Sequence, residues 1–138
     1  MPLDADRVAL CREWLAIASS DLRAALVLRQ SSPPSLHQAL YLCQQCGEKT
    51  LKAFLIWHDV PLMKIHDLKV LSIKCAEIDA SLGSQLLQAD SLTAYGSMYR
   101  YPGGSEIEAS AQDAEDAYQC ASDIMRTILS RLPKEAAP

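Results

Sequence analysis

The stretch SLHQALYLCQQCGEKTLKAFLIWH, residues 35–58, indicates the fold class of this chain. Its apolar residues recur at steps of three and four, the spacing that lines one face of an α-helix. That stripe consists of Leu36, Leu40, Cys43, Gly47, Leu51, Phe54 and Leu55. Pro33 and Pro34 precede the stretch and Pro61 follows it, and a proline cannot continue a helix. We therefore predict one long helix over residues 35–58.

Gly47 stands in the middle of this predicted helix. A glycine at such a position costs about 1 kcal/mol of helix stability relative to alanine. Because glycine has no side chain, a second helix can approach the backbone closely at this position. We therefore expect a close helix crossing at Gly47.

The same periodicity predicts four further helices, over residues 5–30, 67–81, 85–95 and 106–132. Asp67 suits the N-cap of the helix that follows it, and we expect Gly83 to end that helix. Residues 95–105 are rich in turn-forming residues and predict a loop. Long helices joined by short loops predict a single all-α domain over residues 1–138, a five-helix up-and-down antiparallel bundle.

The bulk composition limits the function classes. The 138 residues include 49% hydrophobic and 22% charged residues, which is typical of a globular domain. The formal net charge of −4 gives no overall attraction for nucleic acid, so contact with RNA or a nucleotide requires a local basic cluster. The sequence has no apolar run of about 18 residues, and its start lacks the pattern of a secretory signal. We therefore expect a cytoplasmic protein that does not span a membrane.

The five cysteines are an odd number, and reduced thiols in a cytosolic core are the simplest interpretation. Cys43 and Cys46 form a C-x-x-C pair. A structural zinc site requires about four ligands, and no second pair follows. A thioredoxin-like pair follows a strand, and no strand is predicted before this one. We therefore predict neither a metal site nor a cofactor.

Polar residues interrupt the apolar character of residues 44–53. Glu48 and Lys52 stand four residues apart, so they can form an ion pair along one helix face. Lys49 and Lys52 can together present two cationic donors to an anionic ligand. The alternative is a solvated helix face with an ordinary ion pair.

Two other groups of residues lie outside the long helices. His66 precedes the helix-capping Asp67, and it can bind a phosphate or act as an acid or base, because an imidazole titrates near neutral pH. The alternative is a histidine that only assists the cap. In the late loop, Arg100 can bind a phosphate and Tyr101 can stack on a base. Alternatively, the tyrosines hold this loop on the bundle while Arg100 pairs with a core acid such as Glu48.

Taken in order, the sequence contains Trp14…Ala18…Asp21-Leu22…Ala25, Gln45-x-x-Glu48-Lys49-x-Leu51-Lys52-Ala53, His66-Asp67-Leu68 and Arg100-Tyr101-Pro102. This series of motifs resembles the HEPN family (higher eukaryotes and prokaryotes nucleotide-binding domain). The resemblance covers residues 13–132, nearly the whole chain.

The resemblance implies a five-helix bundle that forms homodimers. Small free-standing members often work beside a minimal nucleotidyltransferase as a toxin–antitoxin-like pair, and others resemble the helical domain of aminoglycoside nucleotidyltransferases. A nucleotide, RNA or another substrate would be the ligand. On this basis the candidate ligand-binding residues are Lys49, Lys52, His66, Arg100 and Tyr101, and the candidate structural partners of the site are Glu48 and Asp67.

Many HEPN proteins are metal-independent ribonucleases that use an arginine followed four to six residues later by a histidine. No arginine in this sequence has a histidine at that spacing, and Arg29 and His37 are too far apart. We therefore assign no catalytic residue and expect no activity from the chain alone. The alternatives are a divergent ribonuclease in which folding brings His66 near Arg100, and a non-catalytic interaction protein.

Overall fold

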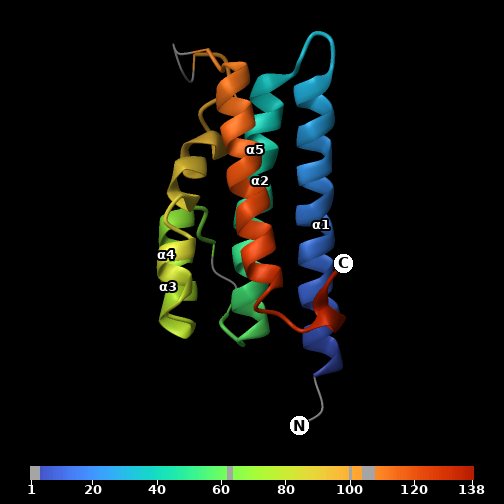
Figure 1. Ribbon diagram of the computed structural model, residues 1–138, viewed down its shortest axis with the longest axis vertical. Helices are drawn as coiled ribbons and strands as arrows, with labels where there is room; N and C mark the ends of the chain where they lie inside the picture. The colour runs from blue at the N-terminus through green and yellow to red at the C-terminus, as the bar shows by residue number, and fades with distance from the viewer. Residues whose placement is uncertain (1–3, 62–63, 100, 104–107) are drawn as a thin grey trace.

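The computed structural model describes residues 4–61, 64–99, 101–103 and 108–138. Within these ranges the regular elements are the helices α1 (Ala5–Gln30), α2 (Leu36–Trp57), α3 (Leu68–Ile78), α4 (Leu82–Gln85) and α5 (Ala111–Leu129), with the 3₁₀-helices η1 (Ala89–Gly96) and η2 (Lys134–Ala136). The long helices α1, α2 and α5 lie side by side along the long axis of the molecule, and α3 and α4 lie beyond them (Figure 1). This arrangement confirms the predicted all-α bundle. In the part of the chain that is described, no helix is long and apolar enough to cross a membrane.

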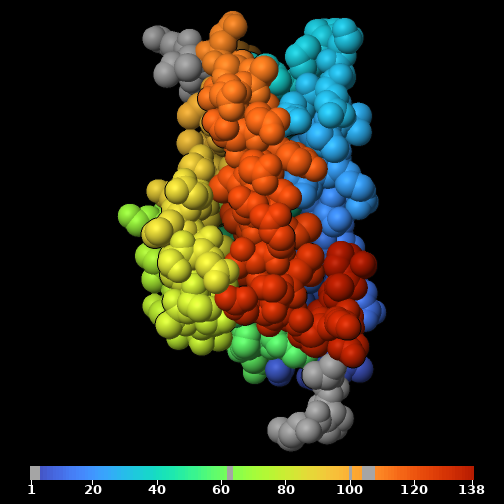
Figure 2. Space-filling view, viewed as in Figure 1, coloured from blue at the N-terminus to red at the C-terminus, as the bar shows by residue number. Residues whose placement is uncertain are grey.

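The helix α2 is the centre of the fold. It packs against α1, α3, α5 and η1, and 14 of its 22 residues are buried. In the space-filling view, α5 covers the middle of one face between α1 and the side formed by α3 and η1 (Figure 2). Because α2 is enclosed on several sides, polar residues on it must find partners within the protein.

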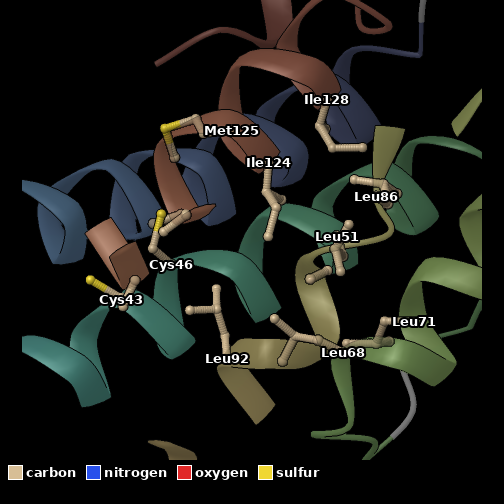
Figure 3. Close-up of a cluster of buried hydrophobic side chains, with 14 of the residues drawn as sticks. Cys43, Cys46, Leu51, Leu68, Leu71, Leu86, Leu92, Ile124, Met125 and Ile128 are labelled. Atoms are coloured by element: carbon tan, nitrogen blue, oxygen red, sulfur yellow. The ribbon is translucent and has the colours of Figure 1, made fainter. Parts of the chain in front are cut away.

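Gly47 lies where α2 meets two other elements. A Cβ atom added at Gly47 would lie 2.8 Å from Leu68 Cδ2 and 3.2 Å from Leu92 Cδ1. The predicted close crossing is therefore present, and α3 and η1 are the elements that approach. The surrounding core contains Cys43, Cys46, Leu51, Leu68, Leu71, Leu86, Leu92, Ile124, Met125 and Ile128, contributed by several helices (Figure 3).

A smaller core lies between α1, α2 and the C-terminal segment. Ala136 of η2 is fully buried beside Cys11, Leu15 and Ala53. Arg12 donates a hydrogen bond to the backbone carbonyl of Glu135. The end of the chain is thereby held against α1 (Figure 1).

Several predicted boundaries differ from those observed, and one of them is the end of the last helix, which is Leu129 rather than Leu132. The third helix ends at Ile78, and Gly83 lies inside α4 rather than at the end of α3. Most of the predicted helix over residues 85–95 is the 3₁₀-helix η1.

The last helix begins at Ala111, because Ser110 and Asp113 form a capping box at that point. The predicted start of this helix, Glu106, and the first residue of its apolar stripe, Ile107, lie outside the described residues.

Candidate functional site

Glu48 is a buried acid with three polar partners. Its side chain is 7% exposed. Its Oε1 accepts a hydrogen bond from Gln44 Nε2 at 3.1 Å and lies 3.0 Å from His66 Nδ1. Its Oε2 accepts from Lys52 Nζ at 3.3 Å. The predicted Glu48–Lys52 pair is therefore formed, and it is buried rather than solvated.

The contacts of Glu48 determine which nitrogen of His66 carries the proton. A carboxylate that is paired with Lys52 can only accept hydrogen bonds, so we assign the proton to His66 Nδ1. In the neutral ring, Nε2 is then an acceptor. The His66 side chain is 74% exposed, so a ligand can reach this nitrogen.

Gln44 extends the network away from Glu48. It is 1% exposed, and its Oε1 accepts a hydrogen bond from Gln45 Nε2 at 2.8 Å. A Cβ atom added at Gly96 would lie 3.2 Å from Gln44 Cδ, so the end of η1 approaches this amide closely. Gln44 is thus held in one orientation by contacts on several sides.

Two loop-to-helix contacts hold His66 near Glu48. Asp67 caps α3 by accepting from the backbone N–H groups of Lys69 and Val70 at 2.8 and 3.3 Å, which confirms the predicted N-cap. The N–H of Leu68 donates to Thr93 Oγ1 at 3.1 Å. The start of α3 is therefore tied to η1, and His66 precedes this junction by two residues.

These residues surround a polar pocket of about 480 Å³. It is lined by Tyr41, Gln44, Gln45, Glu48, His66, Asp67, Thr93, Gly96 and Ser97. The volume lies within the range of about 300–1,000 Å³ that is usual for small-molecule sites. Three of the candidate residues, Glu48, His66 and Asp67, are thus brought together by α2 and the start of α3.

The two candidate lysines do not line the polar pocket. Lys49 Nζ lies 2.6 Å from Asp21 Oδ2, which links α2 to α1. Lys52 Nζ contacts Glu48 and is buried. Each ammonium group therefore has its own carboxylate partner within the fold.

Comparison with protein families gives a match to the HEPN domain over residues 11–132. The chain belongs to the HEPN domain family. The crystal structure of ST0689, an archaeal HEPN homologue, superimposes with a TM-score of 0.69 at 24% sequence identity, covering 88% of this chain and 96% of that one. This likeness confirms the HEPN fold. A search of curated proteins found no significant match.

The late loop of this HEPN domain is described only in part. Arg100 lies outside the described residues, and the side chain of Tyr101 is exposed. Tyr99 contacts the bundle, because its ring stacks on His37 at a centroid distance of 4.3 Å. This contact agrees with the interpretation that the tyrosines hold the loop on the bundle.

The thiols of Cys43 and Cys46 lie in the hydrophobic core. Cys43 and Cys46 are 1% and 0% exposed, and burial raises the pKa of each thiol to about 12. Among the described residues, no group of three or more His, Cys, Asp or Glu side chains is arranged to hold a metal ion. The C-x-x-C pair packs as part of the hydrophobic core.

Sequence reasoning did not select Tyr41, Gln44, Thr93 or Ser97 as site residues. For Gln44 a signal was present, since it stands four residues before Glu48 and therefore shares its helix face. Tyr41, Thr93 and Ser97 reach the pocket through the packing of η1 and the following turn on α2.

Proposed function

We propose that this HEPN domain is a nucleotide-binding or substrate-positioning domain. The observation that carries the proposal is the polar pocket around buried Glu48 and its exposed partner His66. Carboxylate and amide groups can hydrogen-bond the base and ribose of a nucleotide, and the exposed Nε2 of His66 adds an acceptor. Because the internal network already holds these groups in place, little entropy is lost when a ligand binds.

The proposal includes protein partners. We infer a homodimer that works beside a minimal nucleotidyltransferase in a toxin–antitoxin-like pair, since the sequence motifs resemble those of small free-standing HEPN proteins. An apolar groove between α3 and the segment from α4 to the start of η1 supports a contact with another protein, because Ile73 and Leu87 on it are 51% and 74% exposed. Five unpaired cysteines support a cytoplasmic location.

Thermal denaturation with and without nucleotides tests the ligand. A nucleotide at 100 times its Kd should stabilise the native protein by about 2.7 kcal/mol, which raises the Tm by several degrees at this size. We expect His66→Ala to weaken the shift and Glu13→Gln, at an exposed position of α1, to leave it unchanged. Millimolar nucleotides that leave the wild-type Tm unmoved would count against the proposal.

The partner part of the proposal has a separate test. The mass of the purified protein in solution should be that of a dimer, and a nucleotidyltransferase encoded beside it should co-purify with it. A strictly monomeric mass would contradict the homodimer, whatever the outcome with nucleotides.

One observation favours RNA cleavage as a second candidate function. Glu48 contacts Nδ1 of His66, and the His66 side chain is 74% exposed, an arrangement in which Nε2 can act as a general base. If this function is correct, purified wild-type protein degrades RNA and His66→Ala loses about 10²–10⁴-fold in rate. Cleavage that persists in His66→Ala would exclude this site.

A further inference from the structure

An aromatic cleft of about 200 Å³ adjoins the polar pocket. It is lined by His37, Gln38, Tyr41, Tyr95 and Tyr99. Tyr41 lines both cavities, and Tyr95 of the cleft is followed directly by Gly96 of the polar pocket. The two cavities therefore lie next to each other along α2 and the end of η1.

Three rings in the aromatic cleft form a near-parallel row. His37 and Tyr99 are in direct stacking contact, with centroids 4.3 Å apart and an interplanar angle of 7°. Tyr95 and Tyr99 are inclined by 17°, and their centroids are 6.4 Å apart. Because the tyrosine rings line the cleft, a planar ring of a ligand can stack on them.

Among the described residues near the two cavities, the lysines are not available to a phosphate. Lys49 and Lys52, the described cations of α2, are paired with Asp21 and Glu48. The pKa of Tyr95 is raised by its burial first and by the negative charge of Asp113 second. In such surroundings the uncharged base and the ribose hydroxyl groups of a ligand are favoured over its phosphates, because they bring no further negative charge.

We propose that the aromatic cleft is a base-stacking subsite and that the polar pocket next to it holds the ribose, so that the ligand is recognised as a nucleoside with its phosphates outside. Acidic side chains are suited to ribose, because a carboxylate accepts hydrogen bonds from its hydroxyl groups. This inference rests on the proposed function and defines which part of the nucleotide is bound.

Isothermal titration with adenosine, AMP, ATP and ribose 5-phosphate tests the inference on the wild-type protein. Adenosine, AMP and ATP should bind within about threefold of one another, with little dependence on salt, because phosphate contacts are the source of strong salt dependence. Ribose 5-phosphate, which lacks the base, should bind at least about tenfold more weakly, since stacking of one base has an effect of that order.

Substitutions in the cleft locate the base. Tyr99→Leu, which removes the ring, should weaken adenosine about tenfold or more, whereas Tyr99→Phe, which keeps it, should bind as the wild type does. Ring-proton NMR signals of Tyr95 and Tyr99 in the wild-type protein should shift on addition of adenosine. This measurement does not depend on the folding of any variant.

The outcomes separate this inference from the proposed function. Adenosine binding that is unchanged in Tyr99→Leu, or binding of ATP without binding of adenosine, would overturn the base-stacking subsite and leave a nucleotide site standing. Absence of binding by all four compounds would overturn both.

Discussion

At the scale of single residues, neighbouring members of one motif have different partners. Glu48 contacts His66 from the α3 side of the bundle, whereas Lys49 contacts Asp21 on α1. Successive residues of an α-helix with 3.6 residues per turn point about 100° apart. Gln44, Glu48 and Lys52 are four residues apart and share one face. The motif therefore contacts α1 on one side and the segment before α3 on the other, rather than forming one continuous binding surface.

The cysteines provide a prediction about chemical reactivity. Burial raises the pKa of Cys43, Cys46 and Cys75 to about 12 and that of Cys11 to about 11, and a thiol reacts as its thiolate. We expect iodoacetamide at pH 8 to label the half-buried Cys120 first and the other four only after unfolding.

Mass spectrometry of native and urea-denatured protein measures this order, and all five thiols should be labelled in urea. Rapid native labelling of Cys43 or Cys46 would show that the C-x-x-C pair is accessible, and would reopen the question of a redox role.

At the scale of elements, local hydrogen bonds to a capping side chain set the residue at which a helix begins. Asp67 begins α3 and Ser110 begins α5, each by accepting hydrogen bonds from backbone N–H groups of the first turn. The S-x-x-D pattern at Ser110 and Asp113 was available in the sequence as a capping signal. The apolar stripe alone led to a predicted start at Glu106, because periodicity does not mark the residue at which a helix begins.

The packing of α2 against α3 and η1 predicts opposite effects of two glycine substitutions. Gly47→Ala gains up to about 1 kcal/mol of helix propensity, but its Cβ would lie 2.8 Å from Leu68 Cδ2 in a core where overpacking costs about 1–3 kcal/mol. We expect a net loss of about 1 kcal/mol, measured as a lower Tm.

The matched control is Gly83→Ala. There an added Cβ would meet only Ala76 Cβ at 3.9 Å, an ordinary contact, so the Tm should stay equal or rise slightly. An equal rise in both variants would mean that α3 and η1 can move away from α2 without loss of packing.

At the scale of the whole molecule, one polar contact joins the α3–α4 turn to the end of α5. Arg131 Nε donates to Asp79 Oδ2 at 3.1 Å, and Arg131 also donates to Ser81 Oγ at 3.0 Å. Asp79 and Arg131 are 52 residues apart in the sequence. The contact therefore ties the α3–α4 turn to the end of α5.

This contact predicts a pH dependence of stability. Hydrogen bonds from Ser81, followed by Arg131, hold the pKa of Asp79 below its ordinary value of 3.8. Because the folded-state pKa is the lower one, the stabilisation is present above pH 3.8 and is lost as the pH falls further.

Asp79→Asn should therefore lower the Tm at pH 7, and the difference from wild type should shrink towards zero at lower pH. Glu77→Gln, an exposed acid of α3, serves as the control and should follow the wild type throughout. A difference that is as large at pH 2.5 as at pH 7 would show that the charge of Asp79 is not the cause.

The sequence by itself determined the long helices and the contacts within them. The apolar stripe of residues 35–58, the breaks at Pro33-Pro34 and Pro61, the cap at Asp67 and the Glu48–Lys52 pair all depend on residues within about four positions of each other. Helical geometry alone places such residues together, so a linear pattern is sufficient to predict them.

Only the tertiary structure decided the site. Its contacts join segments that are distant in the sequence. His66 approaches Glu48, Lys49 pairs with Asp21 and so lies away from the polar pocket, and the ring of His37 stacks on Tyr99, which is followed in the row by Tyr95. Their positions depend on how α3, η1 and the late loop pack on α2, and that packing is set by the shape of the whole core around Gly47. A periodic pattern shows which face of a helix is buried, but the neighbour that covers that face is chosen by long-range packing.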